Sequence, residues 1–310
     1  MSSISTAAAG SPSGTGPSAA PNLGGRSRPG ERVIETVLML SAMLSVVITI
    51  GILIALIEPV LHFFGQVPFG EFFATGGRFA VLPLVAGTLM VTVIALLVAI
   101  PLGLGAAMYL SEYASRRARK LLKPTVELLA GVPSVVYGFF ALTFVTPTLL
   151  QGILDLDVNF TNALSAGLVL GVMIIPTIAS LAEDAMSAVP QAMRQGSFAM
   201  GANRMQTTLR VVFPAALSGI AAAIVLGLSR AVGETMIVAL ASGAQKNLSA
   251  DPREGMQLMT GFIAQTAGGE NPVGSVEYNA LFAVGLLLFV MTLVINIVSI
   301  ALVRRYRQVY

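Results

Sequence analysis

The sequence lacks cysteine and contains a single histidine, His62. Without cysteine the chain can form no disulfide, no thiol nucleophile and no cysteine metal site. One histidine also excludes a metal site built from several imidazoles. Thiol chemistry and multi-histidine metal chemistry are therefore excluded before any motif is considered.

Charge is also scarce. Only 11% of the 310 residues are charged, whereas 55% are hydrophobic, and a soluble domain usually carries about 25% charged residues. The formal net charge of +3 does not indicate a general surface for nucleic acid. Several apolar runs reach the ~20 residues that a helix needs to cross a bilayer. The composition predicts an all-α integral membrane protein with several spans.

A nucleotide-binding phosphate loop is missing as well. No Gly-x-x-x-x-Gly-Lys-Ser/Thr segment occurs, and none of Lys120, Lys123 and Lys246 follows the required glycine. The chain itself is therefore expected not to be an enzyme and to hold no cofactor of its own.

The apolar runs predict about six spanning helices, with five or seven as alternatives because prolines interrupt two of the runs. The predicted spans are residues 35–57, 81–110, 126–150, 163–182, 215–241 and 279–303. Residues 1–30 are rich in Ser, Gly and Pro and predict a disordered tail. Residues 31–80 would hold the first helix and an outer loop, residues 81–303 a transmembrane domain, and residues 304–310 a basic C-terminus.

The basic residues are distributed unevenly along this pattern, and such asymmetry sets the orientation of a membrane protein. Four segments that would lie on one side carry most of them: Arg26, Arg28 and Arg32; Arg116, Arg117, Arg119, Lys120 and Lys123; Arg194, Arg204 and Arg210; Arg304, Arg305 and Arg307. We therefore expect both termini and the loop 183–214 in the cytoplasm, and the long polar loop 242–278 outside.

The loop before the predicted fifth span carries the first motif. Its positions read Gln195-Gly196-Ser197, then Gly201, and then Pro214 at the start of the next apolar run. Gly201 can end a short helix because glycine accepts the left-handed conformation common at helix C-termini. The alternative is an ordinary polar loop between two spans.

This spacing resembles the cytoplasmic loop of ABC-importer permeases, although Gln195 replaces an acidic residue of that pattern. The resemblance implies that Gln195, Gly196, Ser197, Gly201 and Pro214 belong to a segment that docks on an ATPase subunit. ATP and magnesium would then be bound by that partner.

The second motif is the pair Arg230 and Glu234 inside the apolar run 215–241. Their i, i+4 spacing would place both side chains on one face of a helix. A charge at mid-membrane costs at least ~2.5–3.5 kcal/mol, which makes such residues functional candidates. Small residues along the same stripe, Ala223, Gly227 and Ala241, are expected to leave room for a polar passage. The alternative is a structural ion pair.

Three stretches extend the resemblance to the permeases of the phosphate-specific importer: residues 109–113 (YLSEY), 128–139 (LLAGVPSVVYGF) and 229–236 (SRAVGETM). The last resembles the PstC-type subunit more than its PstA-type partner. Chemistry agrees with this, because the planar guanidinium of an arginine matches phosphate oxygens two at a time.

The resemblance implies a permease subunit of an ATP-driven phosphate importer, with the type I ABC importer permease fold, in the plasma (inner) membrane. It would form the path with a second permease and work with two ATPase subunits and an extracytoplasmic phosphate-binding protein. Three alternatives remain: a permease for another oxyanion such as sulfate or molybdate, an ion-coupled secondary transporter, and a non-transporting membrane scaffold.

Overall fold

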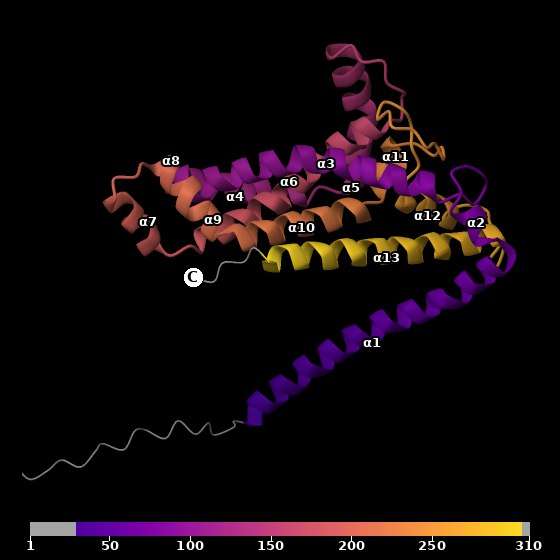
Figure 1. The fold of residues 1–310 in the computed structure, drawn as a ribbon, viewed down its shortest axis with the longest axis horizontal. Helices are drawn as coiled ribbons and strands as arrows, with labels where there is room; N and C mark the ends of the chain where they lie inside the picture. The colour runs from indigo at the N-terminus through magenta and orange to yellow at the C-terminus, as the bar shows by residue number, and fades with distance from the viewer. Residues whose placement is uncertain (1–28, 306–310) are drawn as a thin grey trace, which may run out of the picture. The chain divides into compact units, whose positions relative to one another are not determined.

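The computed structural model describes residues 29–305, so the predictions for the tail up to residue 28 and for residues 306–310 lie outside the described residues. Helices are the regular secondary structure of the described chain, which contains no strand (Figure 1). It divides into two units, one up to Leu53 and one from Ile54 onward, and each is described by itself.

The helices range from three residues in α9 to 38 residues in α1, and three of them, labelled η, are π-helical. Their bounds are α1 Pro29–Gln66, α2 Phe69–Phe72, α3 Leu82–Met108, η1 Tyr109–Tyr113, α4 Arg116–Ala130, α5 Ser134–Phe140, η2 Ala141–Ile153, α6 Ala163–Ser187, α7 Gln191–Ala199, α8 Arg204–Thr207, η3 Thr208–Val212, α9 Phe213–Ala215, α10 Leu217–Gly233, α11 Met236–Ala241, α12 Met259–Ala267 and α13 Val276–Arg305.

Within the described residues, five helices are long and apolar enough to cross a membrane, and a sixth span results if one bent pair counts as a single span. The five are Gly30–Gln66, Leu82–Tyr113, Ser134–Ile153, Ala163–Ser187 and Val276–Ala301; the bent pair is Arg204–Ala215 with Leu217–Gly233, at 71°. The expected all-α protein with about six spans is confirmed.

Two predicted span boundaries were wrong. The third span begins at Ser134 and not at residue 126, because Pro133 lacks an N–H and disfavours helix at the residue before it. Residues 116–130 instead form the separate helix α4, whose first turn is capped by the Ser115 hydroxyl at 3.2 Å from the Ala118 N–H. The fifth span ends at Gly233 and not at residue 241, because Glu234 has an extended backbone.

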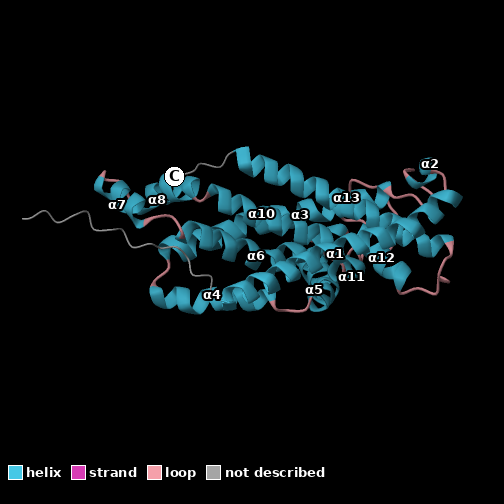
Figure 2. Cartoon of the chain, turned by 90° about the horizontal axis from the view of Figure 1, so that it is seen from below, coloured by secondary structure: helices cyan, strands magenta, loops and turns pink. Residues whose placement is uncertain are grey.

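Helix α6 lies at the centre of the second unit and packs against both α3 and α10 (Figure 2). Small residues allow the close approach: a Cβ added to Gly171 would lie 2.8 Å from the Ala95 carbonyl oxygen. On the α10 side, a Cβ added to Gly219 would lie 2.4 Å from the Cβ of Ala185. Close-packed small residues of this kind are the usual basis of helix association in membranes.

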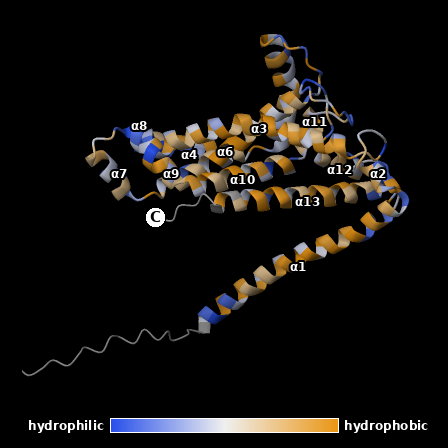
Figure 3. Ribbon diagram, viewed as in Figure 1, coloured by the Kyte–Doolittle hydropathy of each residue, from blue (hydrophilic) through white to orange (hydrophobic). Residues whose placement is uncertain are grey.

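The second unit has two ends with different elements. One end, called here the α7 end, carries α4, α7, α8 and the last turns of α13, and the other, the α12 end, carries α2, α11 and α12 (Figure 1). Hydrophobic residues run along the long helices, while hydrophilic residues gather near α8 (Figure 3). The motif loop and the 242–278 loop therefore lie at opposite ends.

Candidate functional site

The motif loop forms a helix that glycine ends. Helix α7 begins at Gln191, four residues before the first residue of the motif, Gln195, and Gly201 follows it with a φ of +83°. The Gly201 N–H donates to the Phe198 carbonyl at 3.0 Å and the Ala202 N–H to the Ser197 carbonyl at 3.2 Å. This pair of bonds is the Schellman arrangement, which requires a left-handed residue at the position of Gly201.

One face of α7 is open to solvent. Gln195 and Gly196 are exposed, and no side chain or backbone atom lies near a Cβ added to Gly196. Phe198 and Met200, which the sequence analysis did not single out, are 47% and 89% exposed. Two exposed apolar side chains therefore lie close together in sequence at the end of α7.

The other face of α7 is tied to the rest of the unit. The Ser197 and Thr207 hydroxyls lie 2.9 Å apart and join α7 to α8. Pro214 lies in α9, immediately before the 71° bend that separates this segment from α10. Pro214 thus precedes α10 as expected, but a bend rather than a straight helix follows it.

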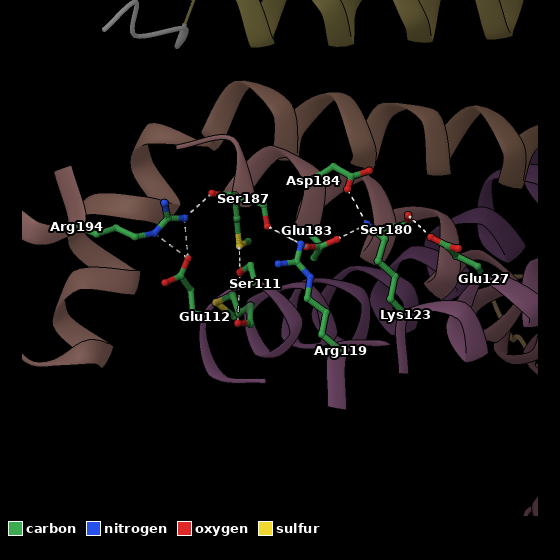
Figure 4. A network of polar contacts seen from close by, with 12 residues as sticks. Ser111, Glu112, Arg119, Lys123, Glu127, Ser180, Glu183, Asp184, Ser187 and Arg194 are labelled. Carbon is green, nitrogen blue, oxygen red and sulfur yellow. Dashed lines mark hydrogen bonds and ion pairs between the residues drawn. The ribbon is translucent and has the colours of Figure 1, made fainter. Parts of the chain in front are cut away.

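Arg194 anchors the start of α7 through a buried ion pair (Figure 4). Its Nη2 lies 2.9 Å from Oε1 of Glu112 in η1, and both side chains are only 8% exposed. The guanidinium also donates to the carbonyls of Met186 and Val189 at the end of α6. The sequence analysis did not single out Glu112, whose side chain is buried because α6, α7 and η1 meet around it.

A second buried carboxylate, Glu183, lies nearby at the end of α6 (Figure 4). Its side chain is fully buried and pairs with Arg119 and with Lys123, whose Nζ lies 2.5 Å from Oε2. Hydrogen bonds to the carboxylates of Asp184 and Glu183 raise the pKa of Lys123 above its ordinary value. The sequence analysis missed this cluster, although two adjacent acids directly after an apolar run were a signal for it.

The predicted geometry of Arg230 and Glu234 was wrong. Arg230 lies in the last turn of α10, but the helix ends at Gly233 and Glu234 is extended, so the two do not share a helix face. No ion pair or hydrogen bond joins them in the part of the chain that the structure describes. The i, i+4 rule fails here because it requires an unbroken helix between the two positions.

Each of the two residues has its own partner. The Arg230 side chain is exposed in this single chain, and its Nη1 lies 3.3 Å from the Thr177 hydroxyl of α6. The Glu234 carboxylate accepts the Met236 N–H at 3.1 Å and so caps the start of α11, while the Glu234 carbonyl accepts the Thr260 hydroxyl of α12. Glu234 therefore organises the backbone where the span breaks.

The stripe of small residues does not line a passage in this structure. Ala223 and Ala241 are buried, and a Cβ added to Gly227 would lie 2.9 Å from Cγ1 of Ile178. These positions serve close packing, chiefly against α6. Among the described residues, no group of three or more His, Asp and Glu side chains is placed to hold a metal ion.

Comparisons with known proteins place this geometry in a family. Residues 99–308 match the family described as "Binding-protein-dependent transport system inner membrane component". The "Probable ABC transporter permease protein YqgH" of Bacillus subtilis is 40% identical over 215 residues, which cover 69% of this chain and 69% of that protein.

Two further relatives are named for phosphate. The "Phosphate transport system permease protein PstC 1" of Mycobacterium tuberculosis is 36% identical over 251 residues, 74% of each chain. The "Phosphate transport system permease protein PstC" of Haemophilus influenzae is 32% identical over 246 residues, 74% of this chain and 77% of that protein.

Solved structures share the fold. A bacterial ABC transporter that imports the acidic polysaccharide alginate matches with a TM-score of 0.63 and 19% identity, over 89% of this chain and 99% of that chain. The MetNI methionine ABC transporter matches with a TM-score of 0.54 and 20% identity, over 74% and 94%. The expected type I ABC importer permease fold is confirmed, while the cargoes of these neighbours say nothing about the cargo of this chain.

Proposed function

We propose that this chain, which belongs to the family of binding-protein-dependent transport system inner membrane components, is a permease subunit of an ATP-driven phosphate importer. Its membership in an ABC importer family and its several apolar helices make it a multi-pass membrane permease component. The identity of the cargo as phosphate is the more specific part of this proposal, and an experiment must test it.

The observation that supports phosphate as the cargo is the position of Arg230. Its guanidinium lies within the membrane-spanning part of the fold, is exposed, and has one neutral partner, the Thr177 hydroxyl. A guanidinium in a low-dielectric passage attracts an anion strongly and can bind two phosphate oxygens together. The PstC relatives support the same cargo, since both are named as phosphate permeases.

The partners follow from the same geometry. A second homologous permease would cover the exposed side of Arg230 and complete the path. The open face of α7, with Phe198 and Met200, would dock on one of two ATPase subunits that bind ATP and magnesium. An extracytoplasmic phosphate-binding protein would deliver cargo at the α12 end. In this proposal the α7 end and both termini face the cytoplasm.

One alternative keeps the architecture and changes the cargo to another oxyanion, such as sulfate or molybdate. It deserves a direct comparison because a single guanidinium does not discriminate among tetrahedral oxyanions. An ion-coupled secondary transporter and a non-transporting scaffold fit poorly in a family of binding-protein-dependent transport components.

The deciding experiment is uptake in a strain that lacks its high-affinity phosphate permeases. Expression of this chain with its partner subunits should restore uptake of radiolabelled phosphate at micromolar concentration, and excess sulfate or molybdate should not compete. Restored sulfate or molybdate uptake without phosphate uptake would replace the proposed cargo.

A further inference from the structure

An open pocket of about 200 Å³ with a mixed polar and apolar lining lies at the α12 end, and neither Arg230 nor the motif loop contributes to it. The loop before α3, the loop after α11, helix α12 and the start of α13 line it. The residues that matter for its chemistry are Arg78, Lys246, Phe262, Thr266, Asn271 and Glu277.

Lys246 is the central group of this cavity. Its side chain is partly buried, and its Nζ donates to the Arg78 carbonyl at 2.5 Å and stands 4.8 Å from the centroid of the Phe262 ring. An ammonium has three N–H donors, so this contact leaves two for another acceptor. Within residues 29–305, no carboxylate forms an ion pair with it. Burial lowers the pKa of Lys246, as expected for a charge without a negative partner.

Arg78 supplies a second cation at the rim. Its Nη2 lies 2.6 Å from Oε1 of Glu277, and its side chain remains 70% exposed, so the guanidinium is accessible from the cavity side. Another basic residue of the same end differs: Arg253 is neutralised by Asp251, with Nη2 and Oδ2 2.7 Å apart. The lining of the cavity therefore includes two cationic side chains and one carboxylate, whereas the charges of Arg253 and Asp251 cancel each other.

We propose that this cavity is a binding site for a phosphate-class oxyanion, held by Lys246 and Arg78, with Glu277 as the internal group that the anion displaces from Arg78. Charge-assisted N–H···O⁻ bonds from an ammonium and a guanidinium are the usual contacts of such an anion in proteins. A volume near 200 Å³ is far above the roughly 10–15 Å³ that one water needs by the same measure, so it accommodates one tetrahedral oxyanion with part of its hydration.

The phosphate group could belong to free inorganic phosphate or to the headgroup of a phospholipid at the membrane surface. Both present the same oxygens to Lys246. The inference goes beyond the proposed transport function, because it requires neither Arg230 nor a transport cycle. Phosphate binding at this cavity can therefore be absent while phosphate uptake is present, and uptake can be absent while binding is present.

The lysines of the chain provide a direct test. The transporter complex, purified in a phosphate-free maltoside detergent, is treated with an amine-reactive reagent, and modification of each lysine is followed by mass spectrometry. Inorganic phosphate should slow modification of Lys246 several-fold and leave the exposed Lys120 unaffected. Arg78→Gln should raise the protecting concentration about tenfold, the effect of losing one charge-assisted bond. Glu277→Gln should lower that concentration, because it frees Arg78.

A second measurement distinguishes free phosphate from a phospholipid headgroup as the ligand. Native mass spectrometry counts phospholipids retained by the wild type and by Lys246→Gln, with Arg253→Gln as the matched control. Protection by phosphate assigns the site to the free anion; a phospholipid lost only in Lys246→Gln assigns it to a headgroup. Neither effect, or equal protection by chloride at the same ionic strength, would overturn the proposal.

Discussion

Two carboxylates, Glu112 and Glu183, are buried at the α7 end, and each meets basic side chains from another helix. A buried ion pair is weak evidence for stability, because desolvation offsets much of the attraction. Removing one partner is a different matter, since it leaves an uncompensated charge in a low-dielectric environment. These residues should therefore be sensitive to single substitutions although the proposed cargo residue, Arg230, is not among them.

Arg194→Met tests this sensitivity. It leaves Glu112 without its cation and removes the guanidinium donors to the carbonyls of Met186 and Val189. We expect the free energy of unfolding to fall by about 3–5 kcal/mol, measured by thermal unfolding in detergent. Arg117→Met removes an exposed arginine of the same end and should change little. Equal stability of the two variants would contradict the buried-pair account.

Arg230→Ala should abolish phosphate uptake per folded molecule while the protein still inserts, since within residues 29–305 the side chain loses a single 3.3 Å hydrogen bond. Arg230→Lys should restore charge but not the planar fork, so partial uptake is expected. Uptake is normalised to protein recovered as a monodisperse species. Wild-type uptake by Arg230→Ala would contradict the role of this arginine.

Glu234 calls for its own variant, because the structure gives it a capping role. In Glu234→Gln the amide oxygen can still accept the Met236 N–H, so folding should be retained. Glu234→Ala removes that acceptor and should cost about 1 kcal/mol, as the loss of a helix cap usually does. Thermal unfolding of both variants compares the stability lost with the capping hydrogen bond and the stability lost with the negative charge. A lower unfolding temperature for Glu234→Gln than for Glu234→Ala would mean that the charge matters more than the hydrogen bond.

At the scale of elements, glycine geometry decides where helices end and how closely they pack. Gly201→Val should disturb the end of α7, because a β-branched residue is strained at a φ of +83°. Phosphate uptake and cargo-stimulated ATP hydrolysis should both fall several-fold while insertion is retained. Gly274, at a φ of +86° with open space around it, lies at the opposite end. Gly274→Val introduces the same strain there and should leave stimulated hydrolysis intact; loss of hydrolysis in both variants would argue against a docking role for α7.

Gly171→Val probes the α3–α6 contact. Its Cβ would lie 2.8 Å from the Ala95 carbonyl oxygen, which belongs to the backbone and cannot rotate away. Overpacking of this kind costs about 1–3 kcal/mol, visible as a lower unfolding temperature. Gly105→Val is the matched control, since that glycine is also helical but faces open space. A similar loss in both would mean that helix propensity, not packing, sets the effect.

Hydropathy predicted the number and approximate place of the spans because apolar length is a local property of the chain. It did not predict the break at Glu234, since Gly233 and Glu234 interrupt an apolar run without changing its hydropathy much. The end of α7 at Gly201 was predictable because glycine is the residue type that this conformation requires. The partners of Glu112 and Glu183 were not, because α6 brings together residues more than sixty positions apart.

At the scale of the whole molecule, the two ends make orientation testable. The chain contains no cysteine, so any introduced thiol is a unique reporter. Ser249→Cys, in the loop at the α12 end, should react with a membrane-impermeant reagent in intact cells. Met200→Cys, 89% exposed beside α7, should react only after the cells are permeabilised. The reverse pattern would invert the proposed topology.

The bend at Ala216 divides the fifth span into two helical segments of unequal length, a short arm and a long arm. At about 1.5 Å per helical residue, the segment 204–215 is roughly 18 Å long and the 17-residue α10 roughly 25 Å. The hydroxyl contact between Ser197 and Thr207 joins α7 to the short arm, and Arg230 lies near the tip of the long arm. If the two helical segments rotate together about Ala216, a displacement of α7 also moves Gly233. The direction of the movement at Gly233 differs by the 71° of the bend. Its size is larger by a factor of about 1.4, the ratio of the two helix lengths.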